Sequence, residues 1–177
     1  RRPRPPRHAG VPRRALGSWP PVPLAGALAG DRRPFDSLVP LPQGPGYHAF
    51  LVQGSEKTAL LDTVDPAHWE TLRGQLQGVP RIDYVIHHHG EQDHSGSLPA
   101  VLALYPDAKV VTNAKCKAEL IDHLHVAEER FQVIEDGETL SLGDKTLRFI
   151  FTPWVHWPET FCSYLEEEKI LFSCDFF

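Results

Sequence analysis

Apolar positions from about residue 31 onward follow two periods, one typical of strands and one typical of short helices. Apolar residues at helical spacing predict helices over Ala67–Leu76, Ser97–Leu104 and Ala114–Leu124. Short apolar runs bounded by turn residues predict strands. In chain order these strands are Tyr47–Val52, Thr58–Asp62, Arg81–His87, Lys109–Thr112, Phe131–Ile134, Thr139–Leu142, Lys145–Thr152, Phe161–Leu165 and Ile170–Cys174. Strands mixed with short helices predict a layered α/β (α+β) domain.

The first 30 residues differ in composition from the rest of the chain. Residues 1–30 are rich in Pro, Arg, Gly and Ala without sustained periodicity, which predicts a basic, disordered leader ahead of a domain over residues 31–177. Six arginines and no acidic residue give the leader a charge of +6, which leaves −11 on residues 31–177 because the whole chain carries −5. An acidic domain argues against nucleic-acid binding.

Two further features of the composition bear on where the protein works. No stretch approaches the ~20 apolar residues that a membrane-spanning helix needs, so no membrane partner is expected. Cys116, Cys162 and Cys174 are scattered and odd in number, which fits neither a disulfide framework nor a cysteine-based zinc site. A reducing compartment, and hence a cytoplasmic location, is expected.

The candidate chemistry is concentrated in one loop that follows the apolar run Tyr84–Ile86. Glu91 and Asp93 would repel each other in so short a loop unless a cation lay between them. The loop therefore predicts a metal site. It holds six potential metal ligands: His87, His88, His89, Glu91, Asp93 and His94.

His156 and Asp175 each follow another predicted strand, and loops at strand carboxyl ends are where layered α/β folds assemble ligand sites. We therefore expect both side chains to join the first cluster. Imidazole and carboxylate ligands without a thiolate fit zinc, iron or manganese. The three carboxylates of Glu91, Asp93 and Asp175 favour iron over zinc but leave both open.

The motif His89-Gly90-Glu91-Gln92-Asp93-His94 resembles the metal-binding motif of the flavodiiron proteins, the A-type flavoproteins. Zinc hydrolases of the same fold have His where Glu91 stands. The resemblance continues through DHSGSLP, TPWVHWPET and LFSCDFF, and covers roughly Asp31–Phe177. It implies a metallo-β-lactamase-like αββα sandwich, truncated to its N-terminal part.

Carried over residue by residue, the resemblance implies a di-iron centre. One iron would be bound by His89, Glu91 and His156, the other by Asp93 and His94, and Asp175 would bridge the two. The family has one more His ligand downstream of Asp175, and a flavodoxin-like domain with FMN, which this chain lacks.

Several aromatic and imidazole side chains fall outside the implied ligand set. His87 and His88 are expected to flank the ligands, and His123 and His125 to face solvent. Trp154 and Trp157, on either side of His156, are expected to pack in the core and shield the site.

The function implied for the intact parent is that of a di-iron oxidoreductase, a flavodiiron-type reductase of dioxygen to water or of nitric oxide to nitrous oxide. FMN would supply the electrons within a head-to-tail homodimer, with rubredoxin or a reduced deazaflavin as donor. This chain alone is expected to be inactive. Two alternatives stay open: a zinc-dependent hydrolase of the same fold, against which Glu91 argues, and an inactive fragment or binding module with an incomplete metal site.

Overall fold

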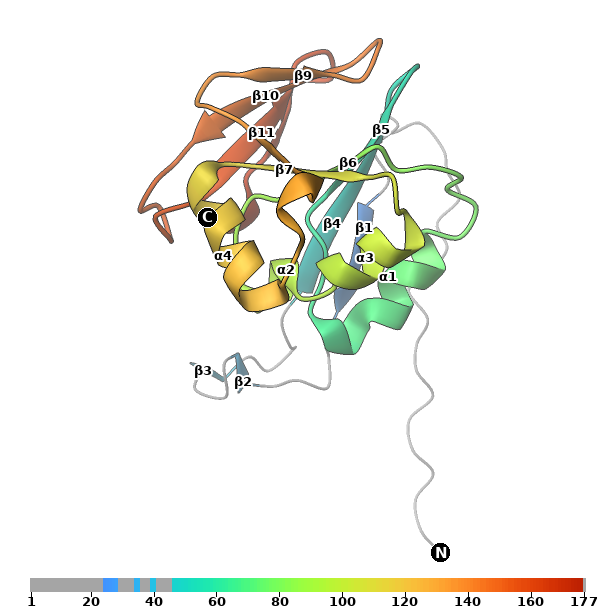
Figure 1. Ribbon diagram of the computed structural model, residues 1–177. Coiled ribbons are helices and arrows are strands. Elements are labelled where there is room, and N and C mark those ends of the chain that lie inside the picture. The colour runs from blue at the N-terminus through green and yellow to red at the C-terminus, as the bar shows by residue number, and fades with distance from the viewer. Residues whose placement is uncertain (1–23, 29–33, 36–38, 41–45, 177) are drawn as a thin grey trace, which may run out of the picture.

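The computed structural model describes residues 24–28, 34–35, 39–40 and 46–176. Two sheets face each other, and helices lie on the far side of the larger sheet (Figure 1). The six-stranded sheet has the order β1-β4-β5-β6-β7-β8 and the four-stranded sheet the order β12-β11-β10-β9. Two short strands, β2 (Pro34–Phe35) and β3 (Val39–Pro40), pair with each other.

The strands of the larger sheet are β1 (Leu24–Leu28), β4 (Gly46–Gln53), β5 (Thr58–Leu61), β6 (Tyr84–Ile86), β7 (Lys109–Thr112) and β8 (Phe131–Val133). Those of the smaller sheet are β9 (Thr139–Ser141), β10 (Thr146–Phe151), β11 (Phe161–Leu165) and β12 (Ile170–Phe172). The α-helices are α1 (Trp69–Gln75), α2 (Gln92–Ser95), α3 (Leu98–Leu104) and α4 (Ala114–Leu124). Short 3-10 helices are η1 (Pro66–His68), η2 (Glu128–Arg130) and η3 (Cys174–Phe176).

The parallel arrangement of β5, β6, β7 and β8 brings their carboxyl ends to one edge of the sheet. Helices connect these strands, α1 between β5 and β6, α3 between β6 and β7, and α4 between β7 and β8. This helical crossover is the usual way to join parallel neighbours. The edge therefore collects the loops that follow each strand.

Alternation along the strands divides the core into two apolar clusters. Leu60 in β5 faces the helices and packs with Leu72 and Leu120, whereas its neighbour Leu61 faces the smaller sheet and packs with Phe149. Each fully buried leucine contributes about 1.5–3 kcal/mol to folding. The helical layer and both sheets of the predicted αββα sandwich are therefore present in the described residues.

The structure differs from the sequence prediction at both ends of the domain. Leu24–Leu28, within the predicted leader, forms β1 and pairs antiparallel with β4 at the edge of the larger sheet. The rest of residues 1–30 lies outside the described residues. The strand predicted over Ile170–Cys174 ends at Phe172, because Cys174 takes a left-handed φ of 48° and the chain turns into η3. No helix in the described ranges is long and apolar enough to cross a membrane.

Candidate metal centre

The loop after β6 is held at the strand edge by backbone hydrogen bonds. His87 N–H donates to the Val111 carbonyl at 2.9 Å, so the chain continues along β7 for one residue beyond Ile86. The hydroxyl of Thr112 donates to the His87 carbonyl at 2.7 Å. The following residues, His88–Gly90, lead into α2, which carries Asp93 and His94. The predicted ligands of this segment thus lie on a short, well-fixed stretch.

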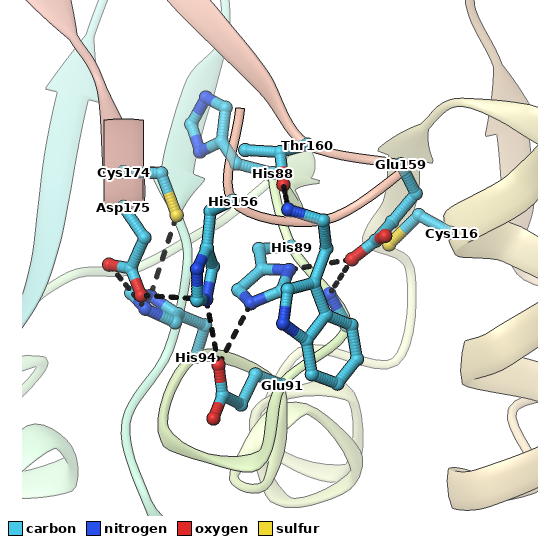
Figure 2. A network of polar contacts seen from close by, with 12 residues as sticks. His88, His89, Glu91, His94, Cys116, His156, Glu159, Thr160, Cys174 and Asp175 are labelled. Carbon is cyan, nitrogen blue, oxygen red and sulfur yellow. Dashed lines mark hydrogen bonds and ion pairs between the residues drawn. The ribbon is translucent and has the colours of Figure 1, made fainter. Parts of the chain in front are cut away.

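The first group of candidate ligands contains His89, Glu91, His156 and Asp175, whose donor atoms lie within 4.8 Å of one another. Figure 2 shows the Glu91 carboxylate between the two imidazoles. Its Oε2 is 3.1 Å from Nε2 of His89 and 3.2 Å from Nε2 of His156. Two ring nitrogens and two carboxylates converging in this way are ligands suited to a divalent ion.

The second group contains Asp93, His94 and Asp175. Nε2 of His94 lies 3.0 Å from Oδ1 of Asp175 and 3.8 Å from Oδ2 of Asp93. The other oxygen of Asp175, Oδ2, lies 3.8 Å from Nε2 of His156 in the first group. One carboxylate thus faces both groups, and the structure brings all of the predicted ligand side chains together.

The acidic side chains in these groups favour the binding of cations. Burial raises the pKa of Asp93, and the charges of Glu91 and Asp175 add to that increase although His94 opposes it. Oδ1 of Asp93 is buried and has no hydrogen-bond partner among the described residues. A metal ion would supply the missing partner and offset the repulsion, so the residues present fit a metal.

His94 itself responds to the acidic surroundings. Burial opposes its charged form, but the hydrogen bond to Asp175 and the charges of Asp62 and Asp93 outweigh that cost and raise the pKa of His94 to about 9. The hydrogen bond from His94 in turn holds the pKa of Asp175 below its usual range. Without metal, the imidazolium of His94 therefore takes the place of a cation in the second group.

Sequence reasoning missed Glu159, which is 1% exposed and contacts His89 of the first group on the ring nitrogen that faces away from Glu91. Its Oε1 lies 2.6 Å from Nδ1 of His89 and accepts the Gly90 N–H at 3.2 Å. Burial opposes the charged form, but these hydrogen bonds outweigh it and lower the pKa of Glu159. A carboxylate only accepts, so Nδ1 of His89 carries the proton and Nε2 is left for a metal. The only signal in the sequence was an acidic residue three positions after His156.

His88 is not a ligand but ties the two sheets together beneath the site. Its Nδ1 lies 2.7 Å from Oδ2 of Asp62, after β5, and its Nε2 lies 2.7 Å from the hydroxyl of Ser163 in β11. Its backbone N–H donates to Oδ1 of Asp62 at 2.9 Å. Burial opposes the charged form of Asp62. The ion pair and hydrogen bond with His88 outweigh that cost and hold the pKa of Asp62 well below its usual range. Nδ1 therefore donates to Asp62, and Nε2 pairs with the Ser163 hydroxyl.

The other imidazoles and the two tryptophans take different positions. His87 is fully buried, and burial lowers its pKa to about 4, so it stays neutral. His123 and His125 are exposed, as predicted. Trp157 packs edge-on against His89 with ring centroids 4.8 Å apart, in line with its predicted shielding role, but it is 38% exposed, so its predicted packing in the core was wrong. Trp154 is 75% exposed, so its predicted packing in the core was wrong.

Comparison with known proteins agrees with this fold and site. The family model described as "ODP family beta lactamase" matches residues 46–177. The type A flavoprotein fprA of Rhodobacter capsulatus is 36% identical over 163 residues, which cover 89% of this chain and 38% of the relative. That share exceeds what residues 31–177 alone could give, so the similarity extends into the segment predicted as a leader.

Solved structures give the same answer. The rubredoxin oxygen:oxidoreductase from Desulfovibrio gigas superposes with a TM-score of 0.80 at 35% identity, covering 85% of this chain and 38% of that chain. The flavodiiron protein from Giardia intestinalis superposes with a TM-score of 0.80 at 28% identity, covering 86% of this chain and 37% of that chain. The chain therefore spans less than two fifths of these relatives. It belongs to the ODP family of β-lactamase-like proteins, and the predicted resemblance to the flavodiiron proteins and their metallo-β-lactamase-like fold is confirmed.

Proposed function

We propose that this chain supplies the di-iron-binding domain of a reductase that converts dioxygen to water or nitric oxide to nitrous oxide. The observation that carries the proposal is the position of Asp175, whose two oxygens face two separate groups of ligands. A shared carboxylate holds two metal ions close enough to act on one small substrate. Relatives bear names of both activities, among them a rubredoxin-oxygen oxidoreductase and an anaerobic nitric oxide reductase flavorubredoxin.

The ligand types support iron as the metal. Each group combines imidazole with carboxylate, and Glu91, Asp93 and Asp175 make the combined set rich in oxygen. Oxygen ligands stabilise the higher charge that iron reaches during redox cycling, whereas zinc has no redox chemistry. Bound iron ions would transfer electrons to the substrate.

The residues of the chain would hold and cover such a centre. Glu159 keeps Nε2 of His89 turned toward Glu91, and the ring of Trp157 covers His89. The side chain of His156 is 38% exposed. A small gas would therefore reach the first group from the side on which His156 lies. Glu91 is the residue at which the chain departs from the zinc hydrolases of this fold.

The electron supply belongs to the same proposal. FMN in a flavodoxin-like domain, on the other subunit of a head-to-tail homodimer, would reduce the centre. Rubredoxin or a reduced deazaflavin would serve as the donor, and the protein would work in the cytoplasm. The relatives support these donors by name, since one is a rubredoxin-oxygen oxidoreductase and another a coenzyme F420H(2) oxidase.

The test is anaerobic loading of the full chain with ferrous iron, followed by metal analysis and by gas-consumption measurements with a chemically reduced flavin as electron source. We expect about two iron ions per chain. Because the chain alone is expected to be inactive, we expect consumption of dioxygen or nitric oxide only when the reduced flavin takes the place of the FMN domain. Asp175→Asn should abolish consumption, whereas Asp122→Asn, at an exposed position of α4, should not. Retention of zinc with ester hydrolysis would favour the hydrolase instead. Bound iron that consumes neither gas would refute reductase activity in this chain.

A further inference from the structure

A third group of potential ligands lies on the other side of His94 and contains a thiol. The donor atoms of Asp62, His94 and Cys174 lie within 4.8 Å of one another. Asp62 and His94 are buried, and Cys174 is half-buried. We refer to these three residues as the thiol group. It shares His94 with the second group of the metal centre but has a sulfur atom in place of a second aspartate.

Two consecutive residues face opposite nitrogens of the His94 ring. Sγ of Cys174 lies 3.7 Å from Nδ1, and Oδ1 of Asp175 lies 3.0 Å from Nε2 (Figure 2). The left-handed φ of Cys174 and the tight turn of η3 produce this arrangement, because an extended chain would point the two side chains away from each other.

The thiol group opens into a cavity of about 180 Å³ between the ends of the two sheets. Its polar lining includes the three residues of the thiol group together with Asp93 and Asp175. A water molecule occupies about 30 Å³ of liquid, so the cavity has room for an ion with several waters. Both oxygens of Asp62 accept hydrogen bonds from His88, yet a carboxylate has about four lone-pair sites and can still bind a metal.

We propose that Asp62, His94 and Cys174 bind a zinc ion that competes with the second group for His94. Zinc takes imidazole, carboxylate and thiolate ligands together, and thiolate favours zinc over harder ions. As zinc binds, the Cys174 thiol and Nδ1 of the His94 imidazolium each release one proton to solvent, and water completes the coordination. A neutral imidazole has one lone pair and one N–H. Zinc on Nδ1 therefore places the proton on Nε2 and excludes a metal there.

As a consequence, His94 can bind either zinc in the thiol group or a metal ion in the second group, but not both. Zinc at the thiol group would leave Asp93 and Asp175 without their imidazole, while the first group keeps His89, Glu91 and His156. Excess zinc would thus block occupation of the second group. Zinc binding can be measured without any reductase activity, although the zinc site shares His94 with the second group.

Cobalt(II), used as a spectroscopic probe of the zinc site, tests this on the metal-free full chain. Wild type should give a thiolate-to-cobalt charge-transfer absorption that titrates with added cobalt, and zinc should abolish it. Cys174→Ser should lose the band. Cys162→Ser is the matched control, since Cys162 is a buried neighbour whose Sγ contacts the Ser173 carbonyl at 3.6 Å. Absence of the band in wild type, or its survival in a folded Cys174→Ser variant, would overturn the proposal.

Two further measurements test Asp62 and the competition. Asp62→Asn should weaken cobalt binding by roughly 10-fold or more, with circular dichroism to confirm that the variant is folded. With zinc present, wild type should take up about one iron fewer per chain than Cys174→Ser, because only wild type withdraws His94 from the second group. Equal iron uptake by the two proteins would refute the competition, whatever the gas-consumption assay gives.

Discussion

Glu159 lies 2.6 Å from Nδ1 of His89 although the two residues are 70 positions apart, and it comes from the loop that also carries His156. One loop between β10 and β11 thus contributes a candidate ligand and orients another. The same carboxylate holds the Gly90 N–H, so it fixes both the ring and the backbone of the first metal-binding segment. The geometry of the first group therefore depends on a residue that would not touch the metal.

Replacing Glu159 should weaken metal binding without removing a ligand. Glu159→Ala leaves Nδ1 of His89 buried without a partner, and loss of such outer contacts lowers metal affinity about 10–100-fold. Competition against a chromophoric chelator measures the change. Glu135→Ala, an exposed acid nearby, is the control and should leave affinity unchanged. Equal affinities of the two variants would show that His89 needs no orienting carboxylate.

Asp175 should matter more than Asp93, because Asp175 belongs to both groups and Asp93 to one. Asp175→Asn should lower the number of tightly bound metal ions by more than Asp93→Asn does. Metal analysis after dialysis against a weak chelator gives these numbers directly. The same loss from both variants would mean that Asp175 serves the second group alone.

The link between the sheets through His88 should contribute to stability. Ser163→Ala leaves Nε2 of the buried His88 without its hydrogen bond, which costs about 1–3 kcal/mol. Denaturant unfolding of the metal-free chain measures this loss. Tyr164→Phe removes a hydroxyl from the next residue of β11, which is only half-buried, and should cost less than about 0.5 kcal/mol. Similar losses from the two variants would argue that His88 does not join the sheets.

The two tryptophans beside His156 should differ in their effects. Trp154→Ala, at a 75% exposed position, should change stability by less than about 0.5 kcal/mol. Trp157→Ala removes the ring that packs on His89 and should both destabilise the chain and weaken metal binding. Unfolding curves and metal titrations of the two variants distinguish these roles. A larger loss from Trp154→Ala would contradict the observed packing.

Much of the fold could be predicted because its signals are local. The strand Lys109–Thr112 and the helix Ala114–Leu124 match the prediction residue for residue, since each has a clear period and Asn113 caps the helix. The positions of His156 and Asp175 after strands also predicted their approach to the first cluster. These residues follow β10 and β12, which run in the same direction on either side of the antiparallel β11, so both strands end at the same edge of the smaller sheet.

The residues that escaped prediction act through contacts that no local pattern encodes. Asp62 and Ser163 lie on different sheets and are linked through His88, which hydrogen-bonds to both. Strand β1 was missed because it is a short edge strand of small residues beside a proline-rich stretch. The turn at Cys174 needs a left-handed backbone, which the sequence gives no reason to expect of a cysteine.

The raised pKa of His94 makes the metal-free chain sensitive to alkaline pH. In the folded chain His94 stays protonated to about pH 9, whereas in the unfolded chain it loses its proton near its ordinary value of 6.5. The stabilisation is therefore complete below pH 6.5 and is lost as pH rises toward 9, by up to about 3 kcal/mol. Denaturant unfolding at several pH values should show this decline in wild type and not in His94→Gln.

Metal binding has the opposite dependence, because a metal must displace the proton on Nε2. The affinity of the second group should rise about tenfold per pH unit until about pH 9. A flat pH dependence of both stability and affinity would contradict the ion pair between His94 and Asp175.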